Sequence, residues 1–281
     1  MPTLSFNNQQ TGFDRPLIMG IVNVTPDSFS DGGRYHAFDQ ALAHARQLME
    51  EGADILDIGG ESTRPGASEV STETELERVL PLIKQLSGLH IPISVDTSKP
   101  EVMSAAVEAG ASIINDVYAL RRPGALRAAV DSGASICLMH MLGEPRTMQV
   151  NPHYNNVTAE VTGFLKTRAD ALKAAGCDPS RILLDPGFGF GKTLNHNLTL
   201  LRNLHQISTL GYPILVGLSR KSMLGAITGH KNPQDRIYAS LAAALISVQN
   251  GARIVRVHDV AATRDVLNVL DALNKDQMNE A

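Results

Sequence analysis

The chain has 281 residues, of which 43% are hydrophobic and 19% are charged, with a net charge of −4 and a pI near 6.1. This composition is typical of a globular protein with one large core, and the charge argues against a general nucleic-acid or acidic-membrane binder. Cys137 and Cys177 have no C-x-x-C or histidine partner, so neither a zinc site nor a disulfide framework is indicated. No apolar run reaches the roughly 18 residues that a membrane span needs, and we expect a cytoplasmic protein.

Short apolar runs alternate with amphipathic stretches along the chain. Strands are predicted at 16–24, 53–58, 91–96, 112–117, 134–140, 182–185, 213–219 and 253–258. Helices are predicted at 38–51, 72–86, from 98 onward, 124–132, 156–175, 196–210, 235–250 and 261–273. Eight such units without a composition break predict one α/β domain over 1–281, a (β/α)₈ TIM barrel, because open doubly wound sheets usually have about five or six strands. Residues 1–15 are expected to form a short hairpin, and the polar tail from about 274 to fray.

The first of these strands runs into an unusually polar segment. The strand ends on Asn23, and the following residues hold almost nothing that builds a core. They include Phe29 and Asp31, while Pro26 and Gly32 prevent a regular continuation. A loop of this length between compact elements is functional or disordered. We interpret it as an active-site loop at the carboxyl end of a barrel strand, with a mobile surface loop as the alternative.

Polar residues also follow the other predicted strands. The residues at or just past the eight strand ends are Asn23, Asp57, Asp96, Asn115, His140, Asp185, Ser219 and the pair Arg256 and His258. Any one of them could be a helix cap, but capping alone does not explain all eight. Barrel enzymes place their chemistry at the carboxyl ends of the strands, so these residues are the candidate site.

One set of these residues suits a flat heterocycle. Asp96, Asn115 and Asp185 are short acceptors at strand ends, and carboxylates accept two hydrogen bonds from an amidine-like edge. Lys221 lies just past a buried strand and can donate to a ring nitrogen or carbonyl. The alternative is that the carboxylates are structural and pair with a nearby Arg or Lys.

A second set suits an anion. Arg256 and His258 are two residues apart on one strand and therefore face the same way. With Arg64 they indicate a phosphate or diphosphate site, and Asn23 offers an oxygen to Mg²⁺, which often takes only one or two protein ligands beside phosphates. For His258 the alternative is a buried core histidine.

Three familiar motifs are not completed. The segment 186–193 ends like a Walker A loop, but Pro186 stands where its first glycine belongs. The segment 217–221 lacks the closing glycine of a nucleophile elbow, and there is no H-E-x-x-H. Neither a nucleotide loop nor covalent serine catalysis is supported.

With these residues in place, the chain resembles the dihydropteroate synthases, which belong to the pterin-binding barrels. The likeness covers almost the whole barrel in order, and several matching stretches are long. They are Gly20–Gly33, Asp57–Gly66, Ser94–Lys99, Ile114–Asp116, Leu138–Gly143 with Thr147–Gln149, Asp185–Lys192, Ser219–Met223 and Arg256–Asp259. The resemblance implies an enzyme that joins (7,8-dihydropterin-6-yl)methyl diphosphate to 4-aminobenzoate, giving 7,8-dihydropteroate and diphosphate in folate biosynthesis.

The resemblance also implies roles for individual residues. The pterin would be held by Asp96, Asn115, Asp185, Lys221 and Met139. The diphosphate would be held by Thr63, Arg64, Asn23, Arg256, Val257 and His258, with Mg²⁺ at Asn23. The aminobenzoate pocket, which also takes sulfonamides in this family, would be lined by Phe29, Pro65, Phe190, Ser219 and Lys221. Catalysis would depend on Asp96, Asp31, Lys221 and Arg64, and the family suggests a homodimer through the late helices.

The family mechanism breaks the C–O bond before the amine attacks, which leaves a pterin cation. Asp96 and Asp31 would offset its charge while Mg²⁺ and the cationic residues stabilise the departing diphosphate. Loops 25–37 and 60–70 would close and exclude water. Two other functions stay open. A methyltetrahydrofolate-dependent methyltransferase would not need Arg64, Arg256 and His258, and a non-catalytic pterin or phosphate binder would not need the Thr25–Gly33 loop.

Overall fold

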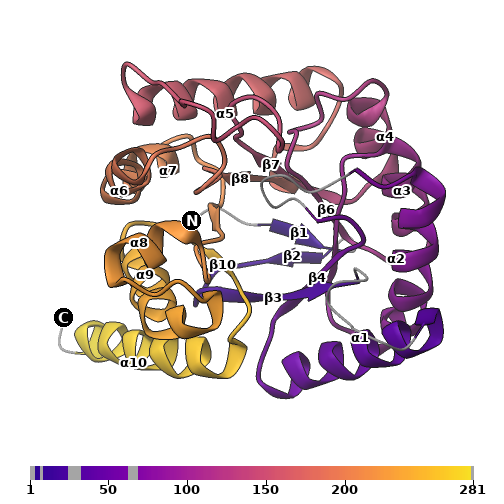
Figure 1. The fold of residues 1–281 in the computed structure, drawn as a ribbon, viewed down its shortest axis with the longest axis horizontal. Coiled ribbons are helices and arrows are strands. Elements are labelled where there is room, and N and C mark those ends of the chain that lie inside the picture. Colours follow the sequence, from indigo (N-terminus) through magenta and orange to yellow (C-terminus); the bar gives the residue numbers. More distant parts are fainter. Residues whose placement is uncertain (1–3, 7–8, 25–32, 63–68, 280–281) are drawn as a thin grey trace.

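The computed structural model describes residues 4–6, 9–24, 33–62 and 69–279. Eight parallel strands form one sheet in the order β8-β7-β6-β5-β4-β3-β10-β9, and a ring of helices surrounds it (Figure 1). The strands are β3 (Leu17–Asn23), β4 (Ile55–Gly59), β5 (Ile93–Asp96), β6 (Ile113–Asp116), β7 (Ser135–Met139), β8 (Ile182–Asp185), β9 (Leu215–Val216) and β10 (Ile254–Val257). All eight lie within their predicted ranges or one residue beyond.

The sheet closes between its first and last strands. Leu184 on β8 forms a parallel bridge with Ile214, just before β9, and the backbone N–H of Leu184 donates to the carbonyl of Pro213 at 3.0 Å. The architecture is therefore the predicted (β/α)₈ barrel. Only two residues of the predicted strand 213–219 keep regular pairing, so the rest of that segment is free to form a loop.

The helices follow the prediction with four differences, the first of which is that the first helix begins at Gly33, inside the predicted loop 25–37, rather than at 38. The helices are α1 (Gly33–Glu50), α2 (Thr72–Leu86), α3 (Pro100–Glu108), α4 (Ala125–Ser132), α5 (Val157–Ala174), α6 (Leu194–Arg202), α7 (Leu204–Ser208), α8 (Ser222–Thr228), α9 (Ile237–Gln249) and α10 (Val260–Asn279). The helix predicted at 196–210 is interrupted at Asn203, whose side chain donates to the carbonyl of Thr199. α8 was not predicted because it is short and begins without a capping side chain. α10 continues through much of the segment that was expected to fray.

Alternate residues of each strand point into the barrel and out toward the helices. On β10, Ile254 belongs to the inner cluster of apolar side chains, whereas Val255 and Val257 pack in the outer core between strands and helices. The same alternation sends Asp57 inward and its neighbours Leu56 and Ile58 outward. Strands buried on both faces have no polar face, which explains why the sequence shows continuous apolar runs.

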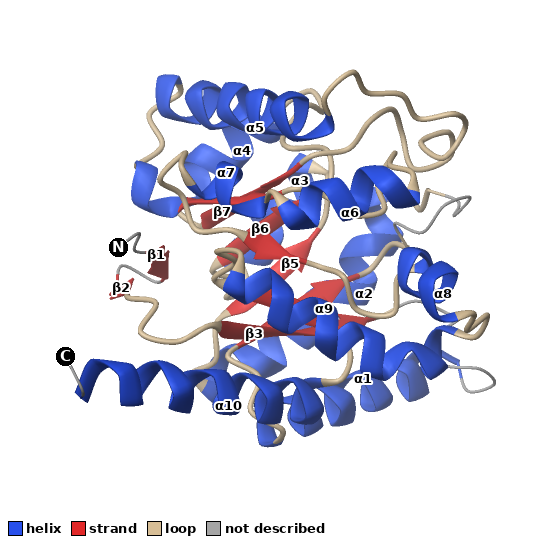
Figure 2. Ribbon diagram, turned by 90° about the vertical axis from the view of Figure 1, so that its left-hand side faces the viewer, coloured by secondary structure: helices blue, strands red, loops and turns tan. Residues whose placement is uncertain are grey.

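A hairpin fills the amino-terminal end of the barrel. β1 (Leu4–Phe6) pairs antiparallel with β2 (Gln9–Thr11), as expected for residues 1–15. Leu4 and Phe13 are buried and belong to the inner cluster with residues from seven of the barrel strands. Figure 2 shows the hairpin just beyond one end of the strands. That end is thereby closed, and the polar strand ends lie at the other.

Among the described residues, no helix is long and apolar enough to cross a membrane. The cytoplasmic location stays a prediction.

Candidate active site

The carboxyl ends of neighbouring strands bring a buried charge cluster together. The Nε of Arg256 on β10 lies 2.5 Å from Oδ2 of Asp57 on β4, and its Nη2 lies 3.0 Å from Oδ2 of Asp96 on β5. The Nδ2 of Asn115 on β6 donates to Oδ2 of Asp57 at 3.3 Å. Asp57, Asp96 and Asn115 are all buried. Acceptors and a guanidinium from four strands therefore meet inside the mouth of the barrel.

The charges of this cluster shift one another's protonation. Burial, and next the charge of Asp57, raise the pKa of Asp96 to about 8, although Arg256 opposes the shift. Burial lowers the pKa of Arg256, but the charges of Asp57 and Asp96 outweigh it and the pKa is raised. The guanidinium thus stays charged, and the cluster holds one acidic group, Asp96, whose protonation a ligand can change.

A second part of the site is built by the loop that follows β8. Oδ1 of Asp185 accepts from the backbone N–H of Gly187 at 2.7 Å, and burial raises the pKa of this carboxyl. Lys221 donates from Nζ to the carbonyl of Phe188, and the same Nζ lies 4.6 Å from the centroid of the Phe190 ring. Burial lowers the pKa of Lys221 to about 8. The loop therefore fixes both the lysine and the ring.

Three glycines let this loop pack so closely. Gly187, Gly189 and Gly191 all have positive φ, between 67° and 79°. A Cβ on Gly187 would lie 1.9 Å from the carbonyl oxygen of His140, and one on Gly191 would lie 2.7 Å from Leu142. A Cβ on Gly189 would press on the Lys221 side chain at 3.3 Å. Glycine is needed at these three positions because the loop packs against His140 and Leu142, just after β7, and against Lys221. The spacing is therefore explained without a nucleotide-binding loop, as the incomplete Walker pattern indicated.

An apolar surface lies beside these polar groups. Met139 at the end of β7 is buried and packs with Val117, Met141 and Met148, and the Phe190 ring packs against this group. Aliphatic, thioether and aromatic side chains of this kind cover a flat ring, while the carboxylates bind its edge.

The residues after β9 and β10 form a smaller polar group. Oγ of Ser219 lies 3.0 Å from Nδ1 of His258, and it accepts from the backbone N–H of His258 at 3.2 Å. Val257 points away from the mouth into the outer core, so only its backbone can face a ligand. Because Arg256 contacts Asp57 and Asp96, it joins the two predicted sets of residues.

Asn23 occupies a place that suits a hard cation. It lies half-buried at the end of β3, opposite Gly59 in the sheet. A Cβ on Gly59 would lie 3.8 Å from Oδ1 of Asn23 and 3.5 Å from Cβ of Asp96. The amide oxygen therefore borders a space that only a glycine leaves open. Within the described ranges, no group of three His, Cys, Asp or Glu side chains could hold a metal. One amide oxygen beside phosphates fits Mg²⁺ but not zinc.

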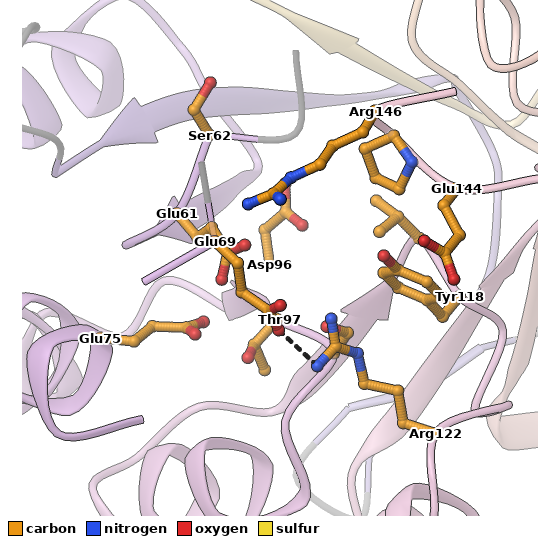
Figure 3. A pocket seen from close by; sticks show the side chains of 13 residues that line it. Glu61, Ser62, Glu69, Glu75, Asp96, Thr97, Tyr118, Arg122, Glu144 and Arg146 are labelled. Carbon is orange, nitrogen blue, oxygen red and sulfur yellow. Dashed lines mark hydrogen bonds and ion pairs between the residues drawn. The ribbon is translucent and has the colours of Figure 1, made fainter. Parts of the chain in front are cut away.

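A cavity of about 140 Å³ adjoins Asp96 on the side of β5 and β6. Thr97, Val117 and Tyr118 line it, and Arg122 and Arg146 extend into it (Figure 3). Arg122 donates to Oε1 of Glu69 at 2.6 Å, shown by the dashed line, and its guanidinium lies 4.7 Å from the Tyr118 ring. The mouth is open next to the charge cluster.

Several predicted site residues fall outside the described part of the chain: Phe29, Asp31, Thr63, Arg64 and Pro65. Their roles stay predictions. The described candidates Asn23, Asp96, Asn115, Met139, Asp185, Phe190, Ser219, Lys221, Arg256 and His258 all lie at the carboxyl ends of strands or in the loops that follow.

Sequence reasoning gave no role to Asp57, although it is the residue that Arg256 and Asn115 share. Its position at a strand end and within a matching stretch was the available signal. What was missing is its partner, because Arg256 lies 199 residues away in the sequence.

Comparison with known proteins decides the family. The model of the pterin binding enzyme family matches residues 19–258. The dihydropteroate synthase of Neisseria meningitidis serogroup B is 54% identical, and the match covers 94% of this chain and 95% of that protein. This chain belongs to the dihydropteroate synthase family.

Solved structures of dihydropteroate synthases agree with this assignment. The Xanthomonas albilineans enzyme with 4-aminobenzoic acid has a TM-score of 0.92 and 53% identity, covering 97% of this chain and 98% of that one. The Burkholderia cenocepacia enzyme complexed with 7,8-dihydropteroate has a TM-score of 0.91 and 49% identity, covering 99% and 98%. The chain is therefore an enzyme, and its class is that of transferases of alkyl or aryl groups other than methyl.

Replacing Asp57 by asparagine is expected to lower the pKa of Asp96, since the change removes a nearby negative charge. In the folded wild type Asp96 keeps its proton up to about pH 8, against an ordinary value of 3.8. Its contribution therefore makes the free energy of unfolding fall as the pH rises between these values. In Asp57→Asn the Asp96 carboxyl should titrate at least about one pH unit lower, equivalent to ~1.4 kcal/mol of lost repulsion.

Carbon-13 NMR of labelled aspartate carboxyls measures this directly. Asp170→Asn, on the exposed face of α5, is the control and should leave Asp96 unchanged. An Asp96 signal that titrates at the same pH in Asp57→Asn and wild type would contradict the electrostatic interpretation.

Proposed function

We propose that this chain condenses (7,8-dihydropterin-6-yl)methyl diphosphate with 4-aminobenzoate, releasing diphosphate and forming 7,8-dihydropteroate, with the residues of the barrel mouth in the roles given below. One observation carries the proposal. Arg256, Asp57, Asp96 and Asn115 form a single buried cluster at the carboxyl ends of four strands, next to Asp185 and Lys221. Membership of the family indicates which substrates to expect. The cluster contains the carboxylate, amide and guanidinium groups that can bind these substrates.

The pterin ring binds over Met139 with its edges on polar groups. Asp96, Asn115 and Asp185 accept from or donate to its N–H and carbonyl groups, and Lys221 donates to a ring acceptor. Burial supports this role because hydrogen bonds to a ring are stronger where water is excluded. The raised pKa of Asp96 means that ligand binding and ionisation of this carboxyl are coupled.

The diphosphate binds on the side of β3 and β10. Arg256 and His258 lie there, and Arg64 and Thr63 are proposed to join them, while Val257 contributes through its backbone. Asn23 is proposed to hold Mg²⁺ through its amide oxygen, and the ion when bound neutralises charge on the departing diphosphate. Because Arg256 also contacts Asp57 and Asp96, it links the leaving group to the ring carboxylates.

The aminobenzoate binds where the loop after β8 meets Lys221. The Phe190 ring and Ser219 form the described part of this pocket, and Phe29 and Pro65 are proposed to complete it. Lys221 lies over the Phe190 ring, so a positive charge and an aromatic face are adjacent. This pairing suits a ligand that has both a benzene ring and a carboxylate.

In the proposed reaction the C–O bond to the diphosphate breaks first. The amine nitrogen then attacks the same methylene carbon and loses a proton. No residue acts as a nucleophile. Positive charge that develops on the pterin lowers the pKa of Asp96, so this carboxyl ionises and, with Asp31 from the first loop, offsets that charge. Arg64 and Arg256 stabilise the leaving group. Exclusion of water matters because water could trap the same cation.

Incubation of the purified chain with both substrates tests the reaction. Pyrophosphate release and 7,8-dihydropteroate formation are expected to match one to one, and both should fall strongly without Mg²⁺. Omission of 4-aminobenzoate is the control and should prevent pteroate formation. Binding of the diphosphate without any turnover would contradict the proposal and favour a non-catalytic binder, and methyl transfer from methyltetrahydrofolate would favour the related methyltransferases.

Asp96→Asn should lower turnover by at least about tenfold, a modest share of typical electrostatic losses, because an amide cannot offset a developing positive charge. Steady-state kinetics of pyrophosphate release measures the change. The matched control is Asp131→Asn, on the exposed surface of α4, which should keep normal turnover. Near-normal turnover of Asp96→Asn would remove this residue from charge stabilisation.

The late helices carry a surface that suits a second copy of the chain. Tyr238 and Ile246 project from one face of α9, Val269 and Leu273 from α10, and Ile227 from α8, and all five are exposed. α9 lies against α10 and also contacts α8, so the three helices that carry these residues are neighbours (Figures 1 and 2). Apolar side chains gathered in this way are typical of an interface. We propose a homodimer through this face.

Tyr238→Asp is expected to shift the chain from dimer to monomer, because a carboxylate would be buried without a partner at the interface. Size-exclusion chromatography with light scattering measures the mass. Val150→Asp, at an exposed position between β7 and α5, should leave the mass unchanged. A wild-type chain that is monomeric at every concentration would contradict the proposed dimer.

A further inference from the structure

Lys192 is a buried lysine to which the proposed reaction gives no role. It follows Gly191 at the end of the loop after β8, and only 3% of it is exposed. Its Nζ lies 2.9 Å from Nδ1 of His140, 2.8 Å from the carbonyl oxygen of Gly187 and 3.1 Å from that of Phe190. In the described part of the chain, no carboxylate forms an ion pair with it.

Burial lowers the pKa of Lys192, and the nearby charge of Asp185 opposes that shift. The three contacts match the three N–H donors of the charged form, the ammonium group. His140 can accept at Nδ1 only while that nitrogen carries no proton. Burial, and next the charge of Lys192, lower the pKa of His140 to about 2, which keeps the imidazole neutral. Because all three donors are used inside the protein, Lys192 is not available to a phosphate. It therefore differs from the lysine of a Walker A loop.

The carbonyls that Lys192 holds belong to the two ends of the loop that shapes the amine pocket. Gly187 begins the tight part of the loop, and its N–H donates to Asp185. Phe190 carries the ring that lies under the Lys221 ammonium. Between them, Phe188 accepts from Nζ of Lys221. Lys192 thus links His140, which directly follows β7, to two loop carbonyls, and one of these belongs to Phe190, whose ring lies beside Lys221.

We propose that Lys192 is a positioning residue for the amine substrate: by binding His140 and the carbonyls of Gly187 and Phe190, it fixes the Phe190 ring in the geometry that receives 4-aminobenzoate. This inference rests on the proposed function. Lys192 does not contact Asp57, Asp96, Asn115 or Arg256, so the part of the pterin site built by β4, β5, β6 and β10 does not depend on it.

If Lys192 has only a structural role, its replacement should have different effects. Its loss would lower stability and leave the ratio between the two substrates' Michaelis constants unchanged. Loss of a positioning lysine raises the KM for 4-aminobenzoate more than it raises the dissociation constant for a bare pterin. Two variants distinguish these roles. One replaces Lys192 by a residue that keeps some of its N–H donors, and the other lowers the stability of the protein at a position away from this loop.

Lys192→Gln is the primary variant because its amide keeps two N–H donors, and Lys192→Met is the second. The KM for 4-aminobenzoate should rise about tenfold, as expected for the loss of roughly 1.4 kcal/mol of hydrogen bonding and loop order. The dissociation constant for 6-hydroxymethylpterin, measured by calorimetry, should change less than about threefold, which corresponds to under ~0.7 kcal/mol.

Two controls match the substitution and the stability loss. Lys166→Gln, on the exposed face of α5, should change neither constant. Leu172→Ala creates a cavity in the fully buried face of α5 and should lower the melting temperature without changing the ratio of the two constants. A Lys192→Gln variant that raises both constants equally, or neither, would overturn the inference. Failure of Lys192→Gln to fold would do the same, since it would assign the residue to folding.

Failure of the proposed function would give a different result, because the wild-type chain would then show no turnover of the two substrates. In that case the loop is tested by amide hydrogen exchange of residues 187–191. Exchange should be faster in Lys192→Gln than in Leu172→Ala, and equal exchange would overturn the inference.

Discussion

The structure of the mouth depends on one guanidinium. Asp57 and Asp96 are buried side by side, and burial of two carboxylates is strongly unfavourable unless a cation compensates them. Arg256 contacts both, so three elements far apart in the sequence are held in one arrangement before any substrate binds. The pKa of Asp96 is nevertheless raised, because burial and the charge of Asp57 outweigh the opposing charge of Arg256. The charged groups of the site are therefore held in place before the substrate binds, and the protonation of Asp96 can still respond to a charge on the ligand. Both properties are expected of a site that stabilises charge.

The barrel separates stability from chemistry along its axis. At one end the hairpin and an inner apolar layer that includes Leu4, Met19 and Leu183 close the interior. At the other end the inward positions of the strands become Asp57, Asp96, Asn115 and Asp185, which are all buried at the mouth. Strand alternation explains this change, because each strand needs only one polar inward residue at its carboxyl end. The outward positions pack against the helices and are apolar, apart from Gly20 and from Asp116, which accepts from the backbone N–H groups of Tyr118 and Leu120.

The glycine-rich loop after β8 shows how a motif gains its meaning from its contacts. Its sequence is similar to a nucleotide-binding loop, but the backbone turns inward onto β7 at Gly187 and Gly191. The lysine that would reach a phosphate is instead enclosed by His140 and two carbonyls. Positive φ at three glycines makes that path possible without strain.

Much of this could be predicted from residues alone. Alternating apolar runs and amphipathic segments determined the number of strands and the closed barrel, because period and run length report burial directly. The polar residues at the strand ends determined where the site lies, because parallel strands place all their carboxyl ends together. Short or uncapped pieces were missed, such as α8, since seven residues carry little periodic signal.

The tertiary structure decided which of these residues act together. Asp57 and Arg256 are 199 residues apart, and no local pattern states that a strand near the start and one near the end are two places apart in a closed sheet. Lys192 likewise gains its role only because β7 lies beside β8 and presents His140 to it. Sequence determines which groups stand at the end of each strand; closure of the barrel determines the distances between them, and chemistry depends on those distances.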